Sequence, residues 1–451
     1  MRETWRVLAA RRDLRFVLSA GLVSMSGDWI LLVGLLYKVY ALTGSTLASA
    51  LTMLSAGVPQ VLLAPVAGVL ADRWDRKLTM VYADLLLAGG LLPLLAVRGS
   101  ADIWIVFPVL FWESAVQQFF SPAQQAMVPR LVPDGQLFVA NALNGQIGDV
   151  SRLVGSALGG VIAAVGGITA VTLADAASFV VSALLLLPVR TSGRVTREAT
   201  APTNRRLAGI AADLRAGLLL IAGQRSLRVL LVFGIVTSLG EGVFATLIAP
   251  FVEHTLHGTS GEFGLVAAAQ AVGGIAGGLF AAAVGQRISA YRLLSLGAVA
   301  FGLADLPIFL YPLVYPALWP AVVGMVVTGL PGALTVAGMT TLLQRGVGDS
   351  YRGRLFGALG ATQGIAVLVG TLAAGYLSRS LGIIPVLAVQ GAVWTLAGLG
   401  LLVLRRYEER AGDPDRSALE MPHQVGDFGG RSDHPGGDRG DPLLRQPEGG
   451  A

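Results

Sequence analysis

Twelve long runs of apolar residues alternate with short polar connections along the chain. A helix needs about 20 apolar residues, at roughly 1.5 Å rise each, to cross a bilayer. The predicted helices span 15–42, 46–71, 78–97, 103–127, 138–165, 168–188, 228–252, 261–284, 292–312, 316–343, 354–378 and 382–404. A transmembrane β-barrel would show short strands of alternating polarity. The pattern therefore predicts an all-α membrane protein with twelve transmembrane helices.

The basic residues fall almost entirely in every second connection. With the N-terminus placed inside the cell, 29 of the 33 Lys and Arg residues lie on the inner side. Lys38, Arg98 and Arg379 lie on the outer side, and Arg152 lies within a span. Since Lys and Arg accumulate in cytoplasmic loops, we expect both termini in the cytoplasm of a bacterial cell, with the chain in its inner or plasma membrane.

The spans form two halves, predicted at 1–190 and 228–405, joined by a cytoplasmic linker at 191–227. In the linker, apolar residues recur at helical spacing from Leu207 to Ile221, which predicts an amphipathic helix on the inner membrane surface. The tail at 406–451 is rich in Gly, Pro, Asp and Arg, and we expect it to be disordered.

The two halves share short motifs in matching register. Residues 152–160 correspond to 367–375, and Gly27-Asp28 in span one corresponds to Gly240-Glu241 in span seven. Small-residue packing motifs also recur by chance, but several matches in one register favour duplication. Duplicated halves are typical of transporters, whose binding site lies at the membrane midplane between the repeats. We therefore predict two pseudo-symmetric six-helix halves.

Composition narrows the chemistry. The chain is 54% hydrophobic and 14% charged, against about 25% charged residues in soluble domains. It has no cysteine, and its four histidines lie in a polar connection or in the tail. We predict no metal site, no cofactor and no enzyme activity. The net charge of +5 reflects topology, so we expect no nucleic-acid partner.

The connection after span two reads GVLADRWDRK, at 68–77. Gly68, Asp72, Arg73, Arg76 and Lys77 resemble the signature loop of the major facilitator superfamily, although Asp75 stands where that loop usually has glycine. The stretches 119–143, 173–179, 213–231 and 351–359 resemble the branch of siderophore exporters and macrolide efflux pumps.

Asp72 ends a helix, where the helix dipole disfavours an anion. The resemblance implies that this carboxylate contacts the start of span eleven, where Arg352 and Arg354 are the matching cations. We hypothesise a charge-linked inner gate made of these residues and the loop of 68–77. The alternative is a topological anchor that only keeps the loop in water.

Seven acidic residues are predicted within spans, and ionisable groups there are costly and commonly functional. They are Asp28, Asp84, Glu113, Asp149, Asp175, Glu241 and Asp305. We expect Asp28 first and Glu241 second to bind protons or cations, because the resemblance places spans one and seven at the central cavity. Trp29 is a candidate for stacking on an aromatic or cationic substrate. The alternative for both carboxylates is local hydrogen bonding and packing.

Other embedded residues admit two interpretations each. Glu113 and Gln117 share a face of span four with Gln124, which suits either a substrate wall or interhelical hydrogen bonds. Asp149 and Arg152 are three residues apart, which suits either a stable ion pair or one that opens during proton exchange. The remaining embedded acids, Asp84, Asp175 and Asp305, are expected to be structural.

The glycine-rich stretch 155–160 resembles the antiporter motif of span five, with Ser156 in place of its proline. These features predict a secondary active exporter of amphipathic small molecules, such as drugs or antibiotics, working by alternating access and proton antiport. Its expected partners are the substrate, protons and the lipid bilayer. The alternatives are a dedicated exporter of a siderophore or another secreted metabolite and, in a different class, a transporter-derived receptor or scaffold.

Overall fold

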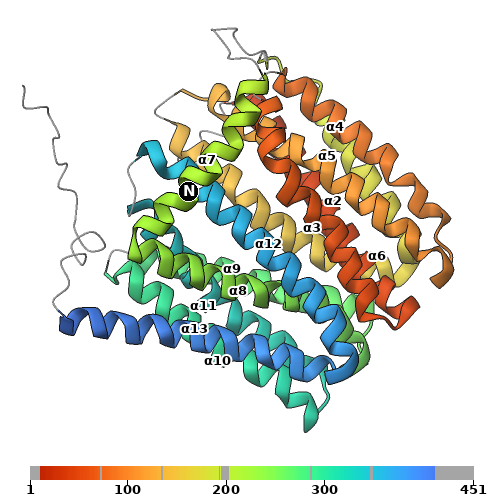
Figure 1. Ribbon diagram of the computed structural model, residues 1–451. Coiled ribbons are helices and arrows are strands. Elements are labelled where there is room, and N and C mark those ends of the chain that lie inside the picture. Colours follow the sequence, from red (N-terminus) through yellow and green to blue (C-terminus); the bar gives the residue numbers. More distant parts are fainter. Residues whose placement is uncertain are drawn as a thin grey trace, which may run out of the picture.

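The computed structural model describes residues 11–71, 74–133, 136–191, 193, 203–284, 287–345 and 349–411. Over these ranges the chain is helical and contains no β-strand. Figure 1 shows two groups of long helices side by side, red to yellow for the first half of the chain and green to blue for the second.

In the described ranges, the N-terminal half contains five long helices. They are α2 (Arg12–Thr43), α3 (Thr46–Ala71), α4 (Arg76–Gly90), α5 (Val106–Met127) and α6 (Leu137–Leu186). Helix α6 runs through two membrane spans and is interrupted at Gly167, where φ is 62°. This left-handed conformation favours glycine because it has no Cβ to clash with the backbone. The interruption lies between the fifth and sixth predicted spans.

The C-terminal half contains six long helices, preceded by helix α7. The elements are α7 (Thr203–Gly223), α8 (Arg225–Pro250), α9 (Ser260–Val284), α10 (Ala290–Leu310), α11 (Leu318–Arg345), α12 (Asp349–Leu381) and α13 (Ile383–Ala411). Short turns complete the chain: η1 (Leu92–Ala96), η2 (Ser100–Ile105), η3 (Val128–Leu131), the π-helical η5 (Phe251–Thr255) and η6 (Tyr311–Leu313).

Within the described ranges, eleven helical segments are long and apolar enough to cross a membrane. One of them is α6, which holds two spans, so the segments correspond to the twelve predicted helices. The prediction of an all-α multi-pass membrane protein is confirmed. Helix α7 occupies the predicted linker, whereas the residues of the predicted tail beyond Ala411 lie outside the described ranges.

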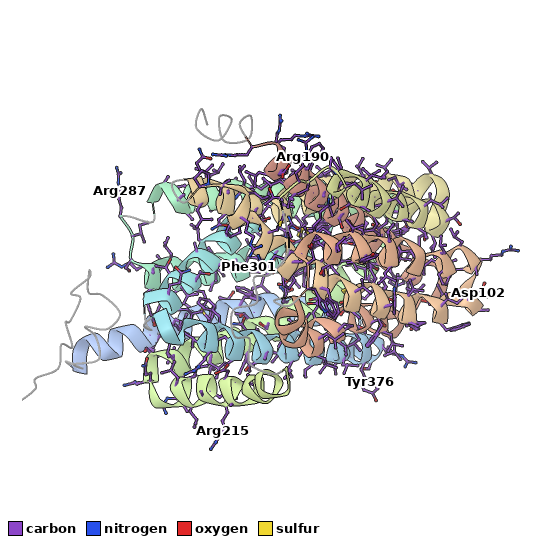
Figure 2. All side chains as sticks on the ribbon, turned by 90° about the horizontal axis from the view of Figure 1, so that it is seen from above. Asp102, Arg190, Arg215, Arg287, Phe301 and Tyr376 are labelled. Carbon is purple, nitrogen blue, oxygen red and sulfur yellow. The ribbon has the colours of Figure 1, made fainter. Side chains whose placement is uncertain are left out.

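We call the end of the bundle with the α2–α3, α8–α9 and α12–α13 connections the distal end, and the opposite end, with α7, the proximal end. The view in Figure 2 places Asp102 and Tyr376 toward one side and Arg215 and Arg287 toward the other. The first two belong to the distal end and the last two to the proximal end, as expected from the alternating direction of the helices.

The two halves are packed against each other at the distal end. An apolar cluster there joins Val33, Leu36 and Tyr40 of α2 to residues of the C-terminal half, such as Phe251 and Phe309. Two hydrogen bonds cross the same interface. The Tyr37 hydroxyl donates to the carbonyl of Gly258 over 2.8 Å, and the Thr46 hydroxyl donates to the carbonyl of Gly375 over 3.1 Å.

Small residues let the halves approach closely. A Cβ built on Gly160 of α6 would lie 2.8 Å from the Cα of Gly264 on α9, so no larger side chain fits either position without displacement. Close approach through small residues is a common way to pack helices in membranes. The distal end is therefore closed in this structure.

Candidate functional site

A cavity of about 160 Å³ lies between the two halves. Each half contributes polar and aromatic side chains to its wall. The N-terminal half supplies Trp29, Met53, Arg152 and Ser156, and the C-terminal half supplies Glu241, Phe244, Phe263 and Gln270. Three of the predicted site residues, Trp29, Arg152 and Glu241, are thus brought together. Sequence reasoning missed the roles of Ser156 and Gln270.

Glycines explain why Glu241 faces the cavity. A Cβ on Gly240 would lie 3.0 Å from Gln390 of α13, and a Cβ on Gly242 would clash with the Val367 carbonyl of α12. Both glycines therefore hold α8 tightly against its own half. The Glu241 side chain between them is exposed, and the space it faces is this cavity.

The glycine-rich stretch of α6 packs on α2 in the same way. A Cβ on Gly155 would lie 2.5 Å from the Trp29 Cβ, and one on Gly159 would lie 2.7 Å from the Ile30 carbonyl oxygen. This contact fixes Trp29 beside Arg152 and Ser156 at the cavity wall. The motif noted in the sequence is therefore the seam between spans one and five.

The predicted ion pair between Asp149 and Arg152 is wrong. Among the described residues, no ion pair within 4.0 Å joins them. Asp149 is exposed, whereas Arg152 extends toward α9, where its Nη2 atom lies 3.3 Å from the position a Cβ on Gly274 would take. The absence of a side chain at Gly274 gives the guanidinium room to cross toward the other half.

A second polar group lies within the N-terminal half. Carboxylate oxygens of Asp28, Glu113 and Asp175 lie within 4.8 Å of one another, and we call these three residues the acid cluster. They come from α2, α5 and α6. Asp175 is fully buried and Glu113 is 9% exposed. We expected Asp175 to be structural. The structure places its carboxylate beside those of Asp28 and Glu113, which were predicted as site residues.

Only part of the acid cluster is hydrogen-bonded. The Gln117 amide donates to Asp28 over 2.9 Å, and the Ser178 hydroxyl donates to Asp175 over 3.1 Å. Asp28 Oδ1, Glu113 Oε2 and Asp175 Oδ2 are buried and have no hydrogen-bond partner among the described residues. Nearby, the Ser24 hydroxyl donates to the fully buried Asp84 over 3.4 Å.

The acid cluster cannot remain fully ionised at low energetic cost. Two unit charges at 4.8 Å repel by roughly 3.5 kcal/mol at an effective dielectric constant of about 20. Three carboxylates would incur three such repulsions, with only two hydrogen bonds among the described residues to stabilise the buried charge. The arrangement is therefore suited to holding protons or a small cation.

The face of span four makes interhelical hydrogen bonds. Gln117 bonds to Asp28 of α2, and the Gln124 amide donates to Asn144 of α6 over 3.0 Å. In the C-terminal half, Asp305 also makes an interhelical hydrogen bond: its carboxylate accepts from the Gln390 amide of α13 over 3.1 Å. Among the described residues, Asp305 makes no hydrogen bond to the backbone at Pro307. The two interpretations of this face of span four were a substrate wall and interhelical hydrogen bonds. For Gln117 and Gln124, the structure agrees with the second.

The predicted gate is only partly described. Asp72, Arg73 and the side chain of Arg352 lie outside the described residues, and Gly68 is placed by its backbone in α3. The gate at Asp72 therefore stays a prediction.

The described loop residues hold elements at the proximal end. The Lys77 ammonium donates to the carbonyls of Leu187 and Val189 at the end of α6, over 2.7 and 2.9 Å. The backbone N–H of Arg76 donates to the Gly193 carbonyl over 3.1 Å. Asp75 accepts from the Leu78 N–H and caps α4, so this departure from glycine starts the helix.

Arg354 has a partner that the sequence did not suggest. Its Nε atom lies 2.8 Å from Asp213 Oδ1 of α7. The ion pair therefore fastens α7 to the start of α12. The same contact continues at Gly217, where a Cβ would lie 2.8 Å from Ala358.

Two six-helix halves around a central cavity, whose mostly apolar wall carries a few polar side chains, have the architecture of a major facilitator transporter. A family model described as "Transmembrane secretion effector" matches residues 6–426. The chain belongs to this family of the major facilitator superfamily and is a multi-pass membrane protein.

Two curated relatives and one solved structure agree with this assignment. The chain is 28% identical to the uncharacterised MFS-type transporter YfiS of Bacillus subtilis, covering 88% of this chain and 94% of the relative. It is 24% identical to macrolide efflux protein A of Streptococcus pyogenes, covering 80% and 88%. A bacterial homolog of the human lysosomal transporter Spinster, solved inward-facing and unoccupied, matches with a TM-score of 0.62 and 14% identity over 91% of this chain and 99% of that chain. Both relatives are transporters by name, and the second is an efflux protein. The solved structure agrees with the fold.

Proposed function

We propose that the protein exports amphipathic small molecules by proton antiport, with the acid cluster as the proton site and the central cavity as the substrate site. The observation that carries this proposal is the acid cluster itself. It places three carboxylates within 4.8 Å and leaves three of their buried oxygens without a hydrogen-bond partner among the described residues. An unpaired buried acceptor is destabilising, and binding a proton converts it into a donor.

Protons suit this site better than a divalent metal. Hard cations such as Ca²⁺ take about six to eight oxygen ligands. With one oxygen from each side chain, the three carboxylates of the acid cluster and the nearby amide oxygen of Gln117, which is also unpartnered among the described residues, offer four ligands. A shared proton needs only two of these oxygens.

Two helices connect the proton site to the substrate site. Helix α2 carries Asp28 in the acid cluster and its neighbour Trp29 in the cavity wall. The span of α6 after the break at Gly167 carries Asp175 in the acid cluster, and the span before that break carries Arg152 with Ser156 in the cavity wall. A change in the charge of the acid cluster therefore acts on helices that also shape the cavity, which is the coupling that antiport needs.

The direction of transport follows from the proposed topology. The basic connections would place the proximal end in the cytoplasm of a bacterial cell. The distal end, closed here by Tyr37 and the apolar cluster, would then face outward. Alternating access by rocking of the halves would open this end after the substrate has bound from inside.

The test is ligand-triggered proton release from acid-loaded inverted vesicles. Macrolides, hydrophobic cations and siderophores form the ligand panel. Wild type is compared with Asp28→Asn, Glu113→Gln and a control, Asp102→Asn, whose acid lies outside the cluster at the distal end. We expect release in wild type and in the control, and at least a tenfold lower rate in the two cluster variants.

Two results would contradict the proposal. Normal release in both cluster variants would remove the proton site from the acid cluster. If the response to the ligand depended on a sodium gradient and not on a proton gradient, the acid cluster would be a sodium site. Response to siderophores alone would select the alternative of a dedicated metabolite exporter.

A further inference from the structure

The central cavity carries two opposite charges on opposite walls. Arg152 belongs to α6 of the N-terminal half and Glu241 to α8 of the C-terminal half. Among the described residues they form no ion pair within 4.0 Å. The two side chains therefore do not neutralise each other directly, and both charged groups can bind a ligand in the cavity.

The Arg152 wall lacks acceptors. Arg152 Nε and Ser156 Oγ are buried and have no hydrogen-bond partner among the described residues. Ser156 is fully buried, and the two residues are one helical turn apart on the face of α6 that lines the cavity. A guanidinium and a hydroxyl side by side form a fitting site for a carboxylate, because a charged acceptor satisfies both donors at once.

The space between the charges is apolar and aromatic. Trp29, Phe244 and Phe263 line the same cavity, and aromatic faces favour flat apolar groups and cations. The Glu241 carboxylate lines the same cavity from the C-terminal half, where an ammonium group would neutralise it.

We propose that the preferred substrates are zwitterionic amphipaths, with a carboxylate bound by Arg152 and Ser156, an amine bound by Glu241, and an apolar or aromatic body between them. This inference rests on the proposed function, since it names the substrate class of that cavity. A ligand with a single charge would displace water from the opposite protein charge without giving that charge a partner, which is unfavourable. A zwitterion pairs both charges and links the two halves.

The experiment measures equilibrium binding to the purified full chain in detergent with four forms of one fluorescent scaffold. The probes are the zwitterion ciprofloxacin, its cationic methyl ester, its anionic N-acetyl derivative and the neutral compound with both changes. We expect the zwitterion to bind at least tenfold more tightly than either singly charged form.

Variants assign each preference to its residue. Arg152→Met should bind ciprofloxacin and its ester equally, and Glu241→Gln should bind ciprofloxacin and its N-acetyl derivative equally. The control Asp102→Asn changes an acid in the distal η2 helix, outside the cavity wall, and should keep the wild-type order. Arg152→Lys retains the charge, so it should restore most of the preference if Arg152→Met folds poorly.

Three outcomes overturn the inference: the ester binding as tightly as the zwitterion, both cavity variants keeping the wild-type order, or no binding by any of the four probes. Binding at equilibrium needs no proton gradient. The wild-type order without ligand-triggered proton release would therefore refute proton antiport while leaving the substrate class standing, and the converse result would refute only the substrate class.

Discussion

Replacing one member of the acid cluster should stabilise the protein while stopping transport. In Asp175→Asn, an amide of nearly the same shape replaces a fully buried carboxyl whose Oδ2 has no partner among the described residues. When the wild-type cluster is fully ionised, three charges lie within 4.8 Å of one another, and each pair repels by roughly 3.5 kcal/mol. Removing the charge of Asp175 removes two of the three repulsions, and proton binding and local relaxation in the wild type reduce the gain to about 1–3 kcal/mol.

The assay is thermal unfolding in detergent at pH 8.5 and at pH 5.5. At pH 8.5 we expect a Tm several degrees above wild type. At pH 5.5 protonation removes the same repulsion from wild type, so the difference should shrink. The matched control Asp102→Asn exchanges the same groups in the distal η2 helix, where the amide oxygen can still accept the hydrogen bond from the Arg98 N–H, and should leave Tm within about 1 °C. An Asp175→Asn protein that is less stable than wild type, or equally shifted at both pH values, would refute the reasoning.

Three further predictions concern the two ends of the bundle. Tyr37→Phe removes a hydrogen bond across the distal end, so it should weaken closure by about 1 kcal/mol and raise distal labelling of an engineered cysteine about fivefold; unchanged labelling would contradict this. A double-mutant cycle on Arg354 and Asp213, whose side chains are 44% and 58% exposed, should give a coupling of about 0.2–1 kcal/mol in thermal or denaturant unfolding, and a much larger value would mean that the pair is buried in the working protein. The chain has no native cysteine, so Asp102→Cys should react with an impermeant maleimide from outside the cell and Arg287→Cys only after permeabilisation; the reverse order would invert the topology.

Much of the fold was predictable because hydropathy and length determine which segments can cross a membrane. The break between spans five and six was also visible, since Gly167 lies between the predicted helices and adopts a left-handed conformation. The repeat pointed to spans one and seven. Glu241 and Trp29 line the cavity, whereas Asp28 lies in the acid cluster and not in the cavity wall.

The acid cluster was only partly predictable. Asp28 and Glu113 were candidates, but nothing in the sequence near Asp175 shows which face of span six meets spans one and four. That rotation is set by tertiary packing, including the close contact of Gly27 with Asp175 and Ser178. The spacing of three residues suggested that Asp149 would pair with Arg152. The long side chain of Arg152 instead extends toward α9, into space left free because Gly274 has no side chain.

The acid cluster lies wholly in the N-terminal half, whereas much of the cavity wall belongs to the C-terminal half. The residues that would supply the driving force therefore lie in one half, whereas the surface that would select the cargo is shared between the two halves. Changes at Phe244, Phe263 or Gln270 can alter which molecules fit without touching a single carboxylate of the acid cluster. Such a division lets the range of exported compounds diversify under selection while the energy-converting half stays constant.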